Sequence, residues 1–432
     1  MDNAPRIASD PSTGSVGTDR DATRNRFPWA TLLLFYAIGL ARCVDWFIIG
    51  ALLTPIKNEL RLPDQQLGQI GAIFFLASSF TSPIFGYLGD RFPRKPFILG
   101  ALTVWNLAAI CCGLTSSLTL LLVWRALVGL GQGCYETLLP GWIGDSFKPR
   151  WRSGVFGIIN STAPVGAAIG FLAGSYLATQ LNWHYAFILT GAPGLVLAAA
   201  FVFAKEPMRG QSEEGKVILT TPTLRQTLQA LSSPLFLVFL IGGMAFITGL
   251  GAISTWGPSF LHRAYGLTNE QASGFFATGW ASAGCLGVLV GGWIGGIWRR
   301  NNPLAYSLII IISSTVTAPA LFIAFLGQSA LLSQSFILVE IFFTSLCFGP
   351  INALLLETVP VNQRSAASAL FVICAYGLSN VISADLIGAI SDQSTLRLGM
   401  LVAPTAFVLS GLLLLVYVLL QFRSRSRQDP AR

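Results

Sequence analysis

Residues 86–95 read Gly-Tyr-Leu-Gly-Asp-Arg-Phe-Pro-Arg-Lys and form a short polar turn between two long apolar segments. A related turn, Gly-Trp-Ile-Gly-Gly-Ile-Trp-Arg-Arg, occupies residues 292–300, 206 positions later, and it also lies between two apolar segments. A glycine-and-cation turn that occurs once in each half of an apolar chain indicates a duplicated helical bundle in a membrane. Such bundles place a binding site between their two halves, so the pattern favours a transporter.

The composition is that of a membrane protein. Of the 432 residues, 53% are hydrophobic and only 11% are charged, whereas roughly a quarter of the residues in a soluble domain are charged. The 44 glycines exceed the average usage of about 7%, and small residues let helices pack closely in lipid. All seven cysteines lie in apolar segments without a CxxC pair, so we expect neither a disulfide framework nor a metal site.

Twelve apolar segments are each long enough to cross a bilayer as a helix, which takes about 20 residues. The expected spans are 28–53, 67–89, 96–115, 118–140, 153–177, 184–204, 234–260, 271–297, 303–326, 332–356, 364–390 and 397–422. The sequence therefore predicts an all-α integral membrane protein with two six-helix bundles around a central cavity.

The polar segments between and beyond these spans predict the domain organisation. Residues 1–26 are polar and lack the apolar core of a signal peptide. The expected parts are a disordered cytoplasmic tail at 1–26, an N-terminal bundle at 27–204, a cytoplasmic central loop at 205–232, a C-terminal bundle at 233–422 and a basic cytoplasmic tail at 423–432.

The basic residues predict which side of the membrane each loop faces. If both termini are cytoplasmic, the inner segments hold 21 of the 27 Lys and Arg residues and the outer loops hold 4. Cytoplasmic loops of membrane proteins carry an excess of Lys and Arg, so we expect both termini in the cytoplasm. In a bacterium, the membrane would be the plasma (inner) membrane. The net charge of +8 then suits the anionic cytoplasmic leaflet, and no nucleic-acid partner is expected.

The turn at 86–95 resembles the signature turn of the major facilitator superfamily, Gly-x-Leu-x-Asp-Arg-x-x-Arg-Lys, which joins that family's second and third helices. The twelve spans, the central loop and the second copy at 292–300 extend this resemblance over nearly the whole chain. It implies a secondary transporter that works by alternating access and closes its cytoplasmic side with this turn against the eleventh helix. The residues expected to gate transport are Gly86, Gly89, Asp90, Arg91, Arg94, Lys95 and Asp385. Because Gly296 stands where Asp90 would be repeated, the second copy should form a weaker latch.

Within the superfamily, the chain resembles Spinster-type transporters. The motifs that carry this resemblance include Asp45, Asp64-Gln65-Gln66-Leu67-Gly68, Arg125-x-x-x-Gly129-x-Gly131 and Ile387-Gly388-x-x-Ser391-Asp392. Two positions depart from the Spinster pattern. That group usually has Arg directly after the first-helix Asp, where this chain has Trp46, and Glu where this chain has Gln132. A charged residue stands one helical turn away from each position, at Arg42 and Glu136.

Five ionisable residues stand out inside the predicted spans: Arg42, Asp45, Arg125, Glu136 and Glu340. Each costs roughly 2.5–3.5 kcal/mol on insertion scales, and such residues mark functional sites by default. Counting about 1.5 Å per residue places Asp45 and Arg125 both some ~10–15 Å from the predicted outer boundary. They could therefore meet between the first and fourth spans, which the resemblance places beside the central cavity.

We interpret Asp45 as a carboxylate that couples transport to protons, with Glu136 as a second proton-coupling group. The proton affinity of Asp45 would change as its surroundings alternate between an apolar environment and a neighbouring Arg. Residues expected to contact the substrate or line the cavity are Arg42, Trp46, Arg125, Gln132, Tyr135 and Glu340. The alternative is a static ion pair of Asp45 with Arg42 or Arg125 that only joins helices.

Several other functions remain open or are disfavoured. The chain contains no GxxxxGK[ST] loop and no HExxH motif, so neither ATP hydrolysis nor another enzymatic activity is expected, and no cofactor is implied. The Spinster resemblance implies an amphipathic anionic lipid such as a lysolipid or a sphingoid phosphate, while two Arg residues in a cavity would equally suit a small organic anion. A non-transporting sensor or a scramblase on the same fold is a further alternative. The expected partners are the substrate, protons and membrane lipids, with the protein as a monomer.

Overall fold

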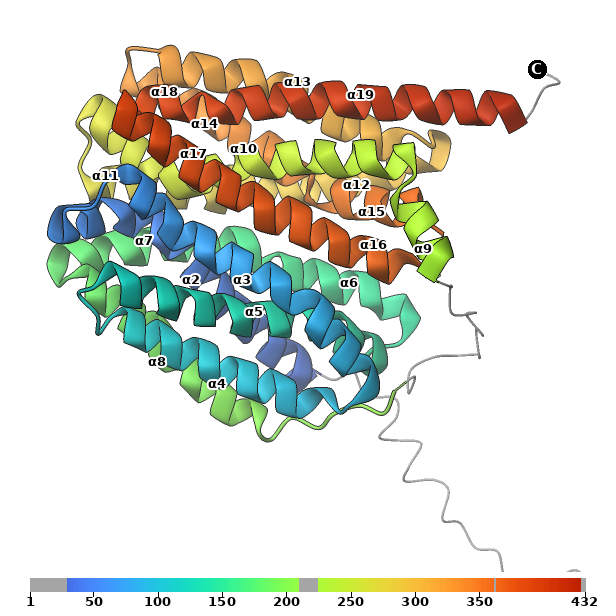
Figure 1. Cartoon of the computed structure of the whole chain (residues 1–432), viewed down its shortest axis with the longest axis horizontal. Helices are drawn as coiled ribbons and strands as arrows, with labels where there is room; N and C mark the ends of the chain where they lie inside the picture. Colours follow the sequence, from blue (N-terminus) through green and yellow to red (C-terminus); the bar gives the residue numbers. More distant parts are fainter. Residues whose placement is uncertain (1–28, 210–223, 361–362, 429–432) are drawn as a thin grey trace, which may run out of the picture.

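The computed structural model describes residues 29–209, 224–360 and 363–428 (Figure 1). Within these ranges the chain consists of helices and turns, without a strand. Twelve helices are long and apolar enough to cross a membrane, as predicted. The predicted tail at 1–26 and residues 210–223 of the predicted central loop lie outside the described residues.

Six spans form the first bundle. They are α2 (Trp29–Leu60), α3 (Asp64–Arg91), α4 (Arg94–Cys112), α5 (Leu118–Ser146), α6 (Pro149–Asn160) with α7 (Thr162–Gln180), and α8 (Trp183–Phe201). Helix α5 packs against α3 and α4, while α2 packs against α7 and α8. The four intramembrane charges of this half lie on two helices, Arg42 and Asp45 on α2 and Arg125 and Glu136 on α5.

Six further spans form the second bundle, after the short helix α9 (Leu224–Leu231). They are α10 (Pro234–Tyr265); α11 (Asn269–Gly279), η1 (Trp280–Gly284) and α12 (Cys285–Asn301); α13 (Ala305–Leu326); α14 (Ala330–Leu346) with α15 (Phe348–Thr358); α16 (Arg364–Phe371), η3 (Val372–Leu378) and α17 (Ser379–Gln393); and α18 (Leu396–Met400) with α19 (Val402–Gln428). The order of spans repeats that of the first bundle, in agreement with the duplication predicted from the two turns.

Proline explains two of the interruptions within spans. Pro164 has no N–H to donate to Asn160, four residues back, and α6 ends at Asn160. Pro350 likewise has none for Leu346, where α14 ends. The segments η1 and η3 are π-helical, a rare form that is frequent at functional sites. Both lie where the second bundle meets the first, η1 against α7 and η3 against α3.

The two bundles lie side by side, the first below and the second above in Figure 1. Helix α3 runs along α17, α7 runs along α11, and α2 packs against α10. Glycine lets the backbones of α3 and α17 touch, because a Cβ at Gly388 would lie 2.6 Å from the carbonyl oxygen of Asp64 and from the Cα of Gln65. At Gly68, an added Cβ would collide with the carbonyl of Ala384.

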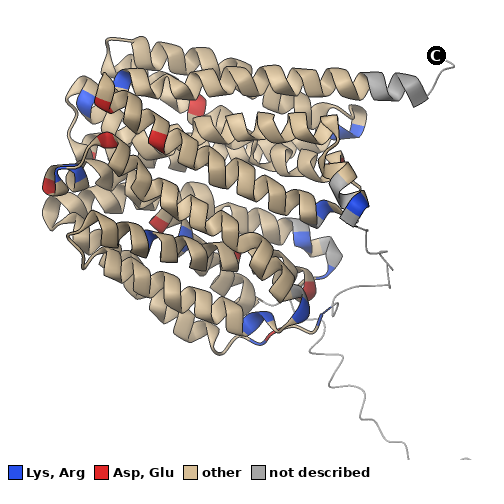
Figure 2. Cartoon of the chain, viewed as in Figure 1, with Lys and Arg blue, Asp and Glu red and all other residues tan. Residues whose placement is uncertain are grey.

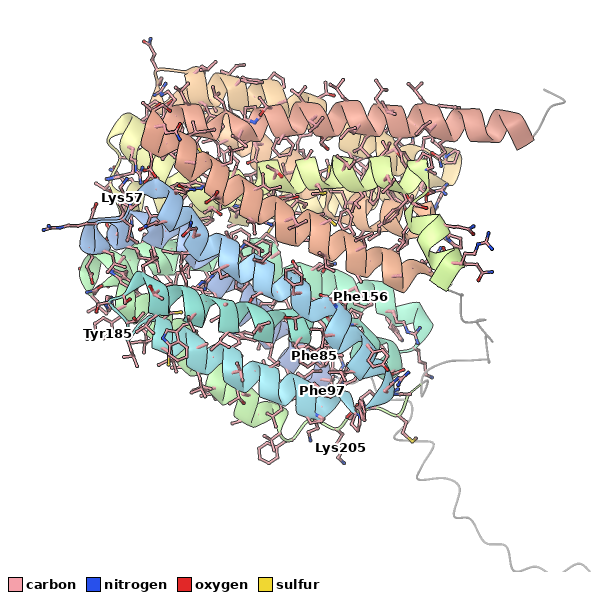
Figure 3. The ribbon with its side chains drawn as sticks, viewed as in Figure 1. Lys57, Phe85, Phe97, Phe156, Tyr185 and Lys205 are labelled. Atoms are coloured by element: carbon pink, nitrogen blue, oxygen red, sulfur yellow. The ribbon has the colours of Figure 1, made fainter. Side chains whose placement is uncertain are left out.

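Charged residues are concentrated at the two ends of the bundles and are sparse between them (Figure 2). Lys57 and Lys205 lie at opposite ends, and Phe85 and Phe97, which flank the 86–95 turn, lie toward the Lys205 end (Figure 3). The distribution of basic residues predicts that the Lys57 end is the outer one. We call these the predicted outer end and the predicted cytoplasmic end.

Several element boundaries differ from the prediction. Helix α2 continues through Pro55 to Leu60, beyond the expected end at residue 53. The carbonyl of Ala51, which Pro55 cannot bond, instead accepts a hydrogen bond from Asn269 Nδ2 at 3.1 Å. In addition, α9 lies within the predicted central loop, and α19 continues through Gln428 into the predicted tail. Because Asn269 of the second bundle satisfies the carbonyl of Ala51, helix α2 can continue past Pro55.

Candidate functional site

Asp45, Arg125 and Gln132 form a buried polar cluster between α2 and α5. Arg125 NH1 lies 3.3 Å from Asp45 Oδ2, and Gln132 Nε2 donates to the same oxygen at 2.9 Å. Each of the three residues is only 1% exposed. The contact of Asp45 with Arg125 that helix counting predicts is confirmed, and Gln132 shares it.

This cluster leaves three buried polar atoms without a partner: Asp45 Oδ1, Arg125 Nε and Gln132 Oε1. The rings of Phe74 and Phe187 lie 4.9 Å and 5.9 Å from the guanidinium carbon of Arg125. In such apolar surroundings the attraction between two charges only repays their desolvation if the geometry is good. The free oxygen of Asp45 is therefore a chemically reasonable place to hold a proton.

Arg42 and Glu136 form a second pair between the same two helices. Arg42 NH1 lies 3.6 Å from Glu136 Oε2, and the side chains are 16% and 58% exposed. Trp46 lies beside the pair, with its ring centroid 6.0 Å from the guanidinium carbon of Arg42. Tyr376 of η3 lies on the side of the second bundle that faces this pair. The arrangement combines a solvent-accessible charged pair with aromatic surfaces from both halves.

Two residues that the sequence grouped with the substrate site lie elsewhere. Tyr135 points into the first bundle, where its hydroxyl donates to the carbonyl of Phe35 at 3.2 Å. It directly precedes Glu136, so its side chain is turned about 100° round the helix from that of Glu136. Glu340 lies on α14 in the second bundle and is 0% exposed. Neither side chain belongs to the pair of Arg42 and Glu136 or to the cluster of Asp45, Arg125 and Gln132, and a substrate role for these two residues stays a prediction.

The 86–95 turn is held by its own bundle. A Cβ at Gly89 would collide with Leu138 of α5, so this glycine permits the close approach of α3 that was expected. Arg94 NH1 pairs with Asp145 Oδ2 at 2.5 Å. The backbone N–H groups of Arg94 and Lys95, at the start of α4, donate to the carboxylate of Glu206 at 2.6 Å and 3.1 Å. A carboxylate at a helix N-terminus is stabilising.

The remaining residues of this turn contribute less to the described contacts. Arg91 lies over the ring of Tyr87, with the guanidinium carbon 4.3 Å from the ring centroid. Beside Gly86, an added Cβ would make ordinary contact with Thr137 at 3.7 Å. The side chain of Asp90 lies outside the described part of the chain. A gating role for this turn therefore stays a prediction.

The second copy of the turn forms a corresponding contact. Arg299, in the last turn of the second span of the second bundle, donates from Nε to Glu357 Oε1 at 2.9 Å. Glu357 lies at the end of that bundle's fourth span, as Asp145 does in the first bundle. Each half thus has an arginine–carboxylate pair to its fourth span at the predicted cytoplasmic end, from the third span in the first bundle and from the second span in the second bundle.

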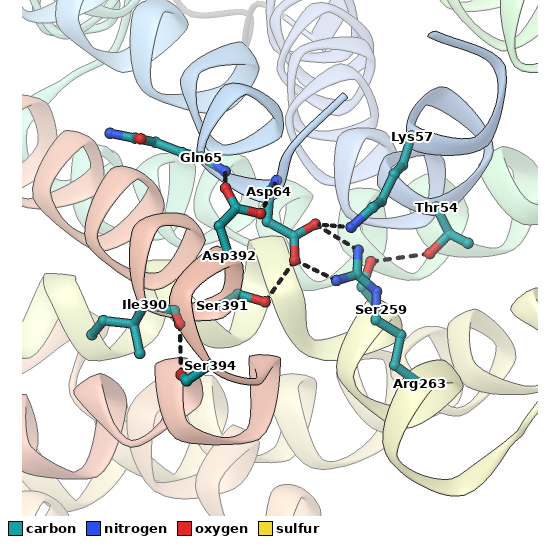
Figure 4. Close-up of polar contacts among 10 residues, drawn as sticks. All are labelled: Thr54, Lys57, Asp64, Gln65, Ser259, Arg263, Ile390, Ser391, Asp392 and Ser394. Atoms are coloured by element: carbon teal, nitrogen blue, oxygen red, sulfur yellow. Dashed lines mark hydrogen bonds and ion pairs between the residues drawn. The ribbon is translucent and has the colours of Figure 1, made fainter. Parts of the chain in front are cut away.

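A third cluster, the outer cluster, joins the two bundles at the predicted outer end (Figure 4). It is centred on Asp64, at the start of α3, and consists of Lys57, Asp64, Gln65, Arg263, Asp385, Ser391 and Asp392. The Asp64 carboxylate accepts from Lys57 of its own bundle at 2.6 Å. Across the interface it accepts from Arg263 at 2.6 Å and 3.0 Å and from Ser391 at 2.6 Å.

Asp392 completes this contact from the opposite side. Its carboxylate accepts from the backbone N–H groups of Asp64 and Gln65 at 2.7 Å and 2.9 Å, so a residue of one bundle caps a helix of the other. Gln65 also donates to Asp385 at 3.2 Å. Asp385, predicted as a gating residue, therefore lies at the end opposite to the 86–95 turn.

Sequence reasoning missed the outer cluster and Tyr376 as site residues. The motifs around Asp64 and Asp392 were noted only as marks of family resemblance, although two carboxylates and two cations at predicted outer helix ends were a usable signal. No signal in the sequence pointed to Tyr376. Among the described residues, no group of three or more His, Cys, Asp or Glu residues could hold a metal ion.

Known proteins are similar to this chain over most of its length. The family model described as "Major Facilitator Superfamily" matches residues 34–384. Protein spinster homolog 1 of Xenopus tropicalis is 32% identical over 383 residues, which cover 84% of this chain and 72% of that protein. The mouse protein spinster homolog 1 is 32% identical over 381 residues, covering 82% and 71%.

Among solved structures, the chain is similar to a bacterial homolog to human lysosomal transporter, Spinster, in an inward-facing and occupied conformation. The TM-score is 0.75 and the identity is 18%, with 91% of this chain and 97% of that chain covered. At this identity the likeness concerns the fold, and it agrees with the arrangement of two six-helix bundles described above.

Proposed function

Since this chain belongs to the Major Facilitator Superfamily and, within it, to the Spinster-type transporters, we propose that it is a proton-coupled secondary transporter that works by alternating access and moves an amphipathic anionic lipid. The observation that carries this proposal is the buried cluster of Asp45, Arg125 and Gln132, placed one helical turn from the accessible pair of Arg42 and Glu136.

Alternating access is supported by the outer cluster. It ties the bundles together at one end through charge-assisted hydrogen bonds from Arg263 and through Asp392 at the start of α3. For the substrate to reach the central site from that side, these contacts must break. We therefore propose that the structure corresponds to the inward-facing half of the transport cycle, with both termini in the cytoplasm and the protein acting as a monomer.

Proton coupling is supported by the chemistry of Asp45. Its Oδ2 is occupied by Arg125 and Gln132, while Oδ1 is buried and free. When Arg125 stays close, the ionised carboxylate is stabilised; when it moves away or turns to a substrate, the carboxylate favours a proton. Movement of one side chain would thus load or release one proton. Glu136, which is largely exposed, would exchange protons with the aqueous phase.

The proposed substrate class is supported by the mixture of groups around Arg42. A guanidinium that is 16% exposed suits a phosphate or carboxylate head group. The neighbouring ring of Trp46, which packs edge-on against Phe75, offers apolar surface to the adjoining part of an amphiphile. A small organic carboxylate would use Arg42 but would leave the aromatic surface unused.

The experiment that tests this proposal uses purified protein in liposomes that contain a pH-sensitive dye. Lysolipids, sphingoid phosphates and small carboxylates are offered in turn to the wild type, to Asp45→Asn and to Glu357→Gln, a control that removes a carboxylate far from the cluster. We expect a lysolipid- or sphingoid-dependent pH change that Asp45→Asn abolishes and Glu357→Gln retains. Substrate movement without any pH change in the wild type would contradict proton coupling, and a response to carboxylates alone would contradict the lipid assignment.

A further inference from the structure

Glu340 stands apart from every cluster described above. It lies in the middle of α14, within the second bundle, and its side chain is completely buried. The hydroxyl of Thr344, one turn along the same helix, lies 3.1 Å from Oε1 and 2.8 Å from the Glu340 carbonyl oxygen, so its one hydrogen is shared between the two acceptors. Oε2 is buried and has no partner. The transport scheme built on Asp45 makes no use of this carboxylate.

No basic side chain in the described part of the chain forms an ion pair with Glu340. The helices packed against α14 are α10, α11, η1, α12, α13 and α15. Their titratable groups are His262, Arg263, Tyr265, Glu270, Cys285, Arg299, Arg300, Tyr306, Cys347 and Glu357. Most lie at helix ends, and the basic ones with known partners are engaged there, Arg263 by Asp64 and Arg299 by Glu357.

An ionised carboxylate in this position would be very costly. Burying an unpaired charge in a medium of low dielectric constant costs far more than any single hydrogen bond returns. A second oxygen without a donor adds to that cost. Glu340 must therefore hold a positive charge of its own, which is either a proton or a bound metal cation.

Helices α13 and α14 also carry buried hydroxyl groups. Thr317 on α13 and Ser345 on α14 are fully buried and have no hydrogen-bond partner, while Ser313 on α13 lies beside the thiol of Cys347. By contrast, Thr315 and Ser335 on the same two helices donate to the carbonyls four residues back, at 2.8 Å and 2.9 Å. The buried hydroxyls thus differ from ordinary membrane-helix hydroxyls, because they are not satisfied by their own backbone.

The register of the two helices places Thr317 near Glu340 in depth. Helices α13 and α14 are antiparallel neighbours, joined by residues 327–329. Ser313 lies beside Cys347, so at 1.5 Å per residue Thr317 comes level with the turn of α14 that holds Glu340 and Thr344. Thr317 follows Ser313 by four residues, so the two side chains lie about 40° apart around α13 and share nearly the same face.

We propose that Glu340, together with the hydroxyls of Thr344 and Thr317, forms an exchangeable site for one monovalent cation in the second bundle. One carboxylate balances one positive charge, and hydroxyl and carboxylate oxygens are suitable ligands for a small hard cation and suitable partners for a protonated acid. The cation is a proton or a sodium ion. This site goes beyond the proposed function, since it is a second ion site that is independent of Asp45 and of the substrate.

Occupancy of this site can reach the interface between the bundles through a short path. Ile341, next to Glu340 in the chain, lies 3.6 Å from the position of a Cβ on Gly284 of η1, and Pro164 of α7 lies 3.6 Å from the same position. The π-helical segment η1 therefore separates the Glu340 helix from the first bundle. A change in charge at Glu340 would act on the element at which the second bundle meets the first.

The test measures ion binding directly and needs no transport, so its failure is separate from failure of the proposed function. Purified protein in detergent is studied by infrared difference spectroscopy across a pH series and by thermal unfolding in sodium chloride against choline chloride at equal ionic strength. The variants are Glu340→Gln and the control Glu357→Gln, which removes a carboxylate at the end of the adjoining helix α15. Thr344→Val keeps the acid and removes one partner.

A protonated-carboxyl band that is lost on raising the pH, in the wild type and Glu357→Gln but not in Glu340→Gln, supports the site with a proton as occupant. Stabilisation specific for sodium that Glu340→Gln abolishes supports it with sodium. With sodium as the occupant, Thr344→Val should weaken the apparent affinity about tenfold, as loss of one hydrogen bond to a charged group predicts. With a proton as the occupant, the same variant should move the loss of the band to higher pH, because the Thr344 hydroxyl stabilises the ionised carboxylate. The proposal would be overturned if the wild type and Glu340→Gln showed the same dependence on pH and sodium. It would also be overturned if the carboxyl band of Glu340 did not change with pH or salt, because a permanently neutral acid exchanges no cation. If Glu340→Gln does not fold, Thr344→Val decides alone by the presence or absence of the affinity change.

Discussion

Arg42 of α2 lies 3.6 Å from Glu136 of α5, and both residues are displaced by one helical turn from the positions at which the Spinster pattern carries its charges. Because α2 and α5 run in opposite directions, a shift of four residues back on one and four forward on the other moves both charges toward the predicted cytoplasmic end. The displacement is about 6 Å for each. Arg42 and Glu136 thus pair with each other nearer that end, and Trp46 and Gln132 occupy the positions at which the Spinster pattern carries charges.

Gln132 is the neutral residue that contacts Asp45 from α5. With Gln132 in the place of a glutamate, a neutral amide donates to Asp45 at 2.9 Å where a second carboxylate would repel it. We expect Gln132→Glu alone to reduce transport strongly, while Gln132→Glu combined with Trp46→Arg restores part of it by returning a balancing charge. The measurement is initial uptake into liposomes, normalised to the amount of folded protein. Equal activity of the single and the double variant would argue against charge balance as the reason.

The ion pair between Arg125 and Asp45 should matter for stability far more than an exposed pair does. Removing one partner of a buried pair leaves an uncompensated charge, so we expect Arg125→Leu to destabilise the protein by about 3–5 kcal/mol. Adding Asp45→Leu should recover much of this loss. The exposed pair of Arg299 and Glu357 serves as the control, for which about 0–1 kcal/mol is expected. For each pair, denaturant unfolding in detergent of the two single variants and the double variant gives the coupling energy. Similar coupling energies for the two pairs would contradict this ranking.

The outer cluster should hold the conformational equilibrium toward the state with the predicted outer end closed. Arg263→Gln removes two charge-assisted hydrogen bonds to Asp64, each worth about 1.5–3 kcal/mol. We expect the open population to rise at least about tenfold. The readout is labelling, by a membrane-impermeant thiol reagent, of a cysteine placed at Thr54, whose hydroxyl lies 3.2 Å from that of Ser259 across the interface.

The same labelling should remain unchanged in Arg299→Gln, because the pair of Arg299 with Glu357 lies within one bundle. An increase of similar size in that variant would indicate general loosening of the protein. The orientation of the chain is tested by the same experiment, since labelling from the outside requires that the predicted outer end faces outward.

Close approach of α3 and α17 offers an independent test of the same closure. At Gly388, a methyl group would lie 2.6 Å from backbone atoms of Asp64 and Gln65, so Gly388→Ala should push the two helices apart and favour the open state. Gly296→Ala is the matched control, because nothing lies within 4 Å of a Cβ at that position. We expect increased outer labelling and slower transport only in Gly388→Ala, and unaltered labelling in both variants would show that this contact does not limit opening.

The carboxylate of Glu206 should contribute to stability at the predicted cytoplasmic end. It accepts from the first two N–H groups of α4, whose N-cap residue Pro93 provides no side-chain cap. We expect Glu206→Ala to cost about 0.5–2 kcal/mol, the usual range for loss of a helix cap. The measurement is denaturant unfolding. Exposed residue Glu270, in the first turn of α11, provides a control in Glu270→Ala, which should have a smaller effect because Thr268 and Gln271 already cap that helix.

The sequence alone was sufficient for the architecture because its determinants are local. Apolar runs of spanning length, polar turns and the repeated glycine-and-cation motif each act over a few tens of residues, and in lipid a segment of that length has little choice but to be a helix. Helix periodicity also sufficed to place Asp45 opposite Arg125, because the two helices are neighbours in the same bundle. Boundaries were less predictable: α2 passes Pro55 since Asn269, distant in the chain, satisfies the freed carbonyl of Ala51.

Only the tertiary structure decided which charges belong together. Arg42 is three residues from Asp45 and shares its helix face, yet it pairs with Glu136, because the adjoining helix α5 presents Arg125 and Gln132 to Asp45 first. The outer cluster joins residues that are 199 and more positions apart, such as Asp64 with Arg263 and Asp392. Likewise, Glu340 resembles the other intramembrane acids in sequence, and only its packing within the second bundle removes it from water and from the basic side chains of the described residues. Spacing along one helix determines which face a residue occupies, but the neighbour that this face meets depends on how twelve helices pack.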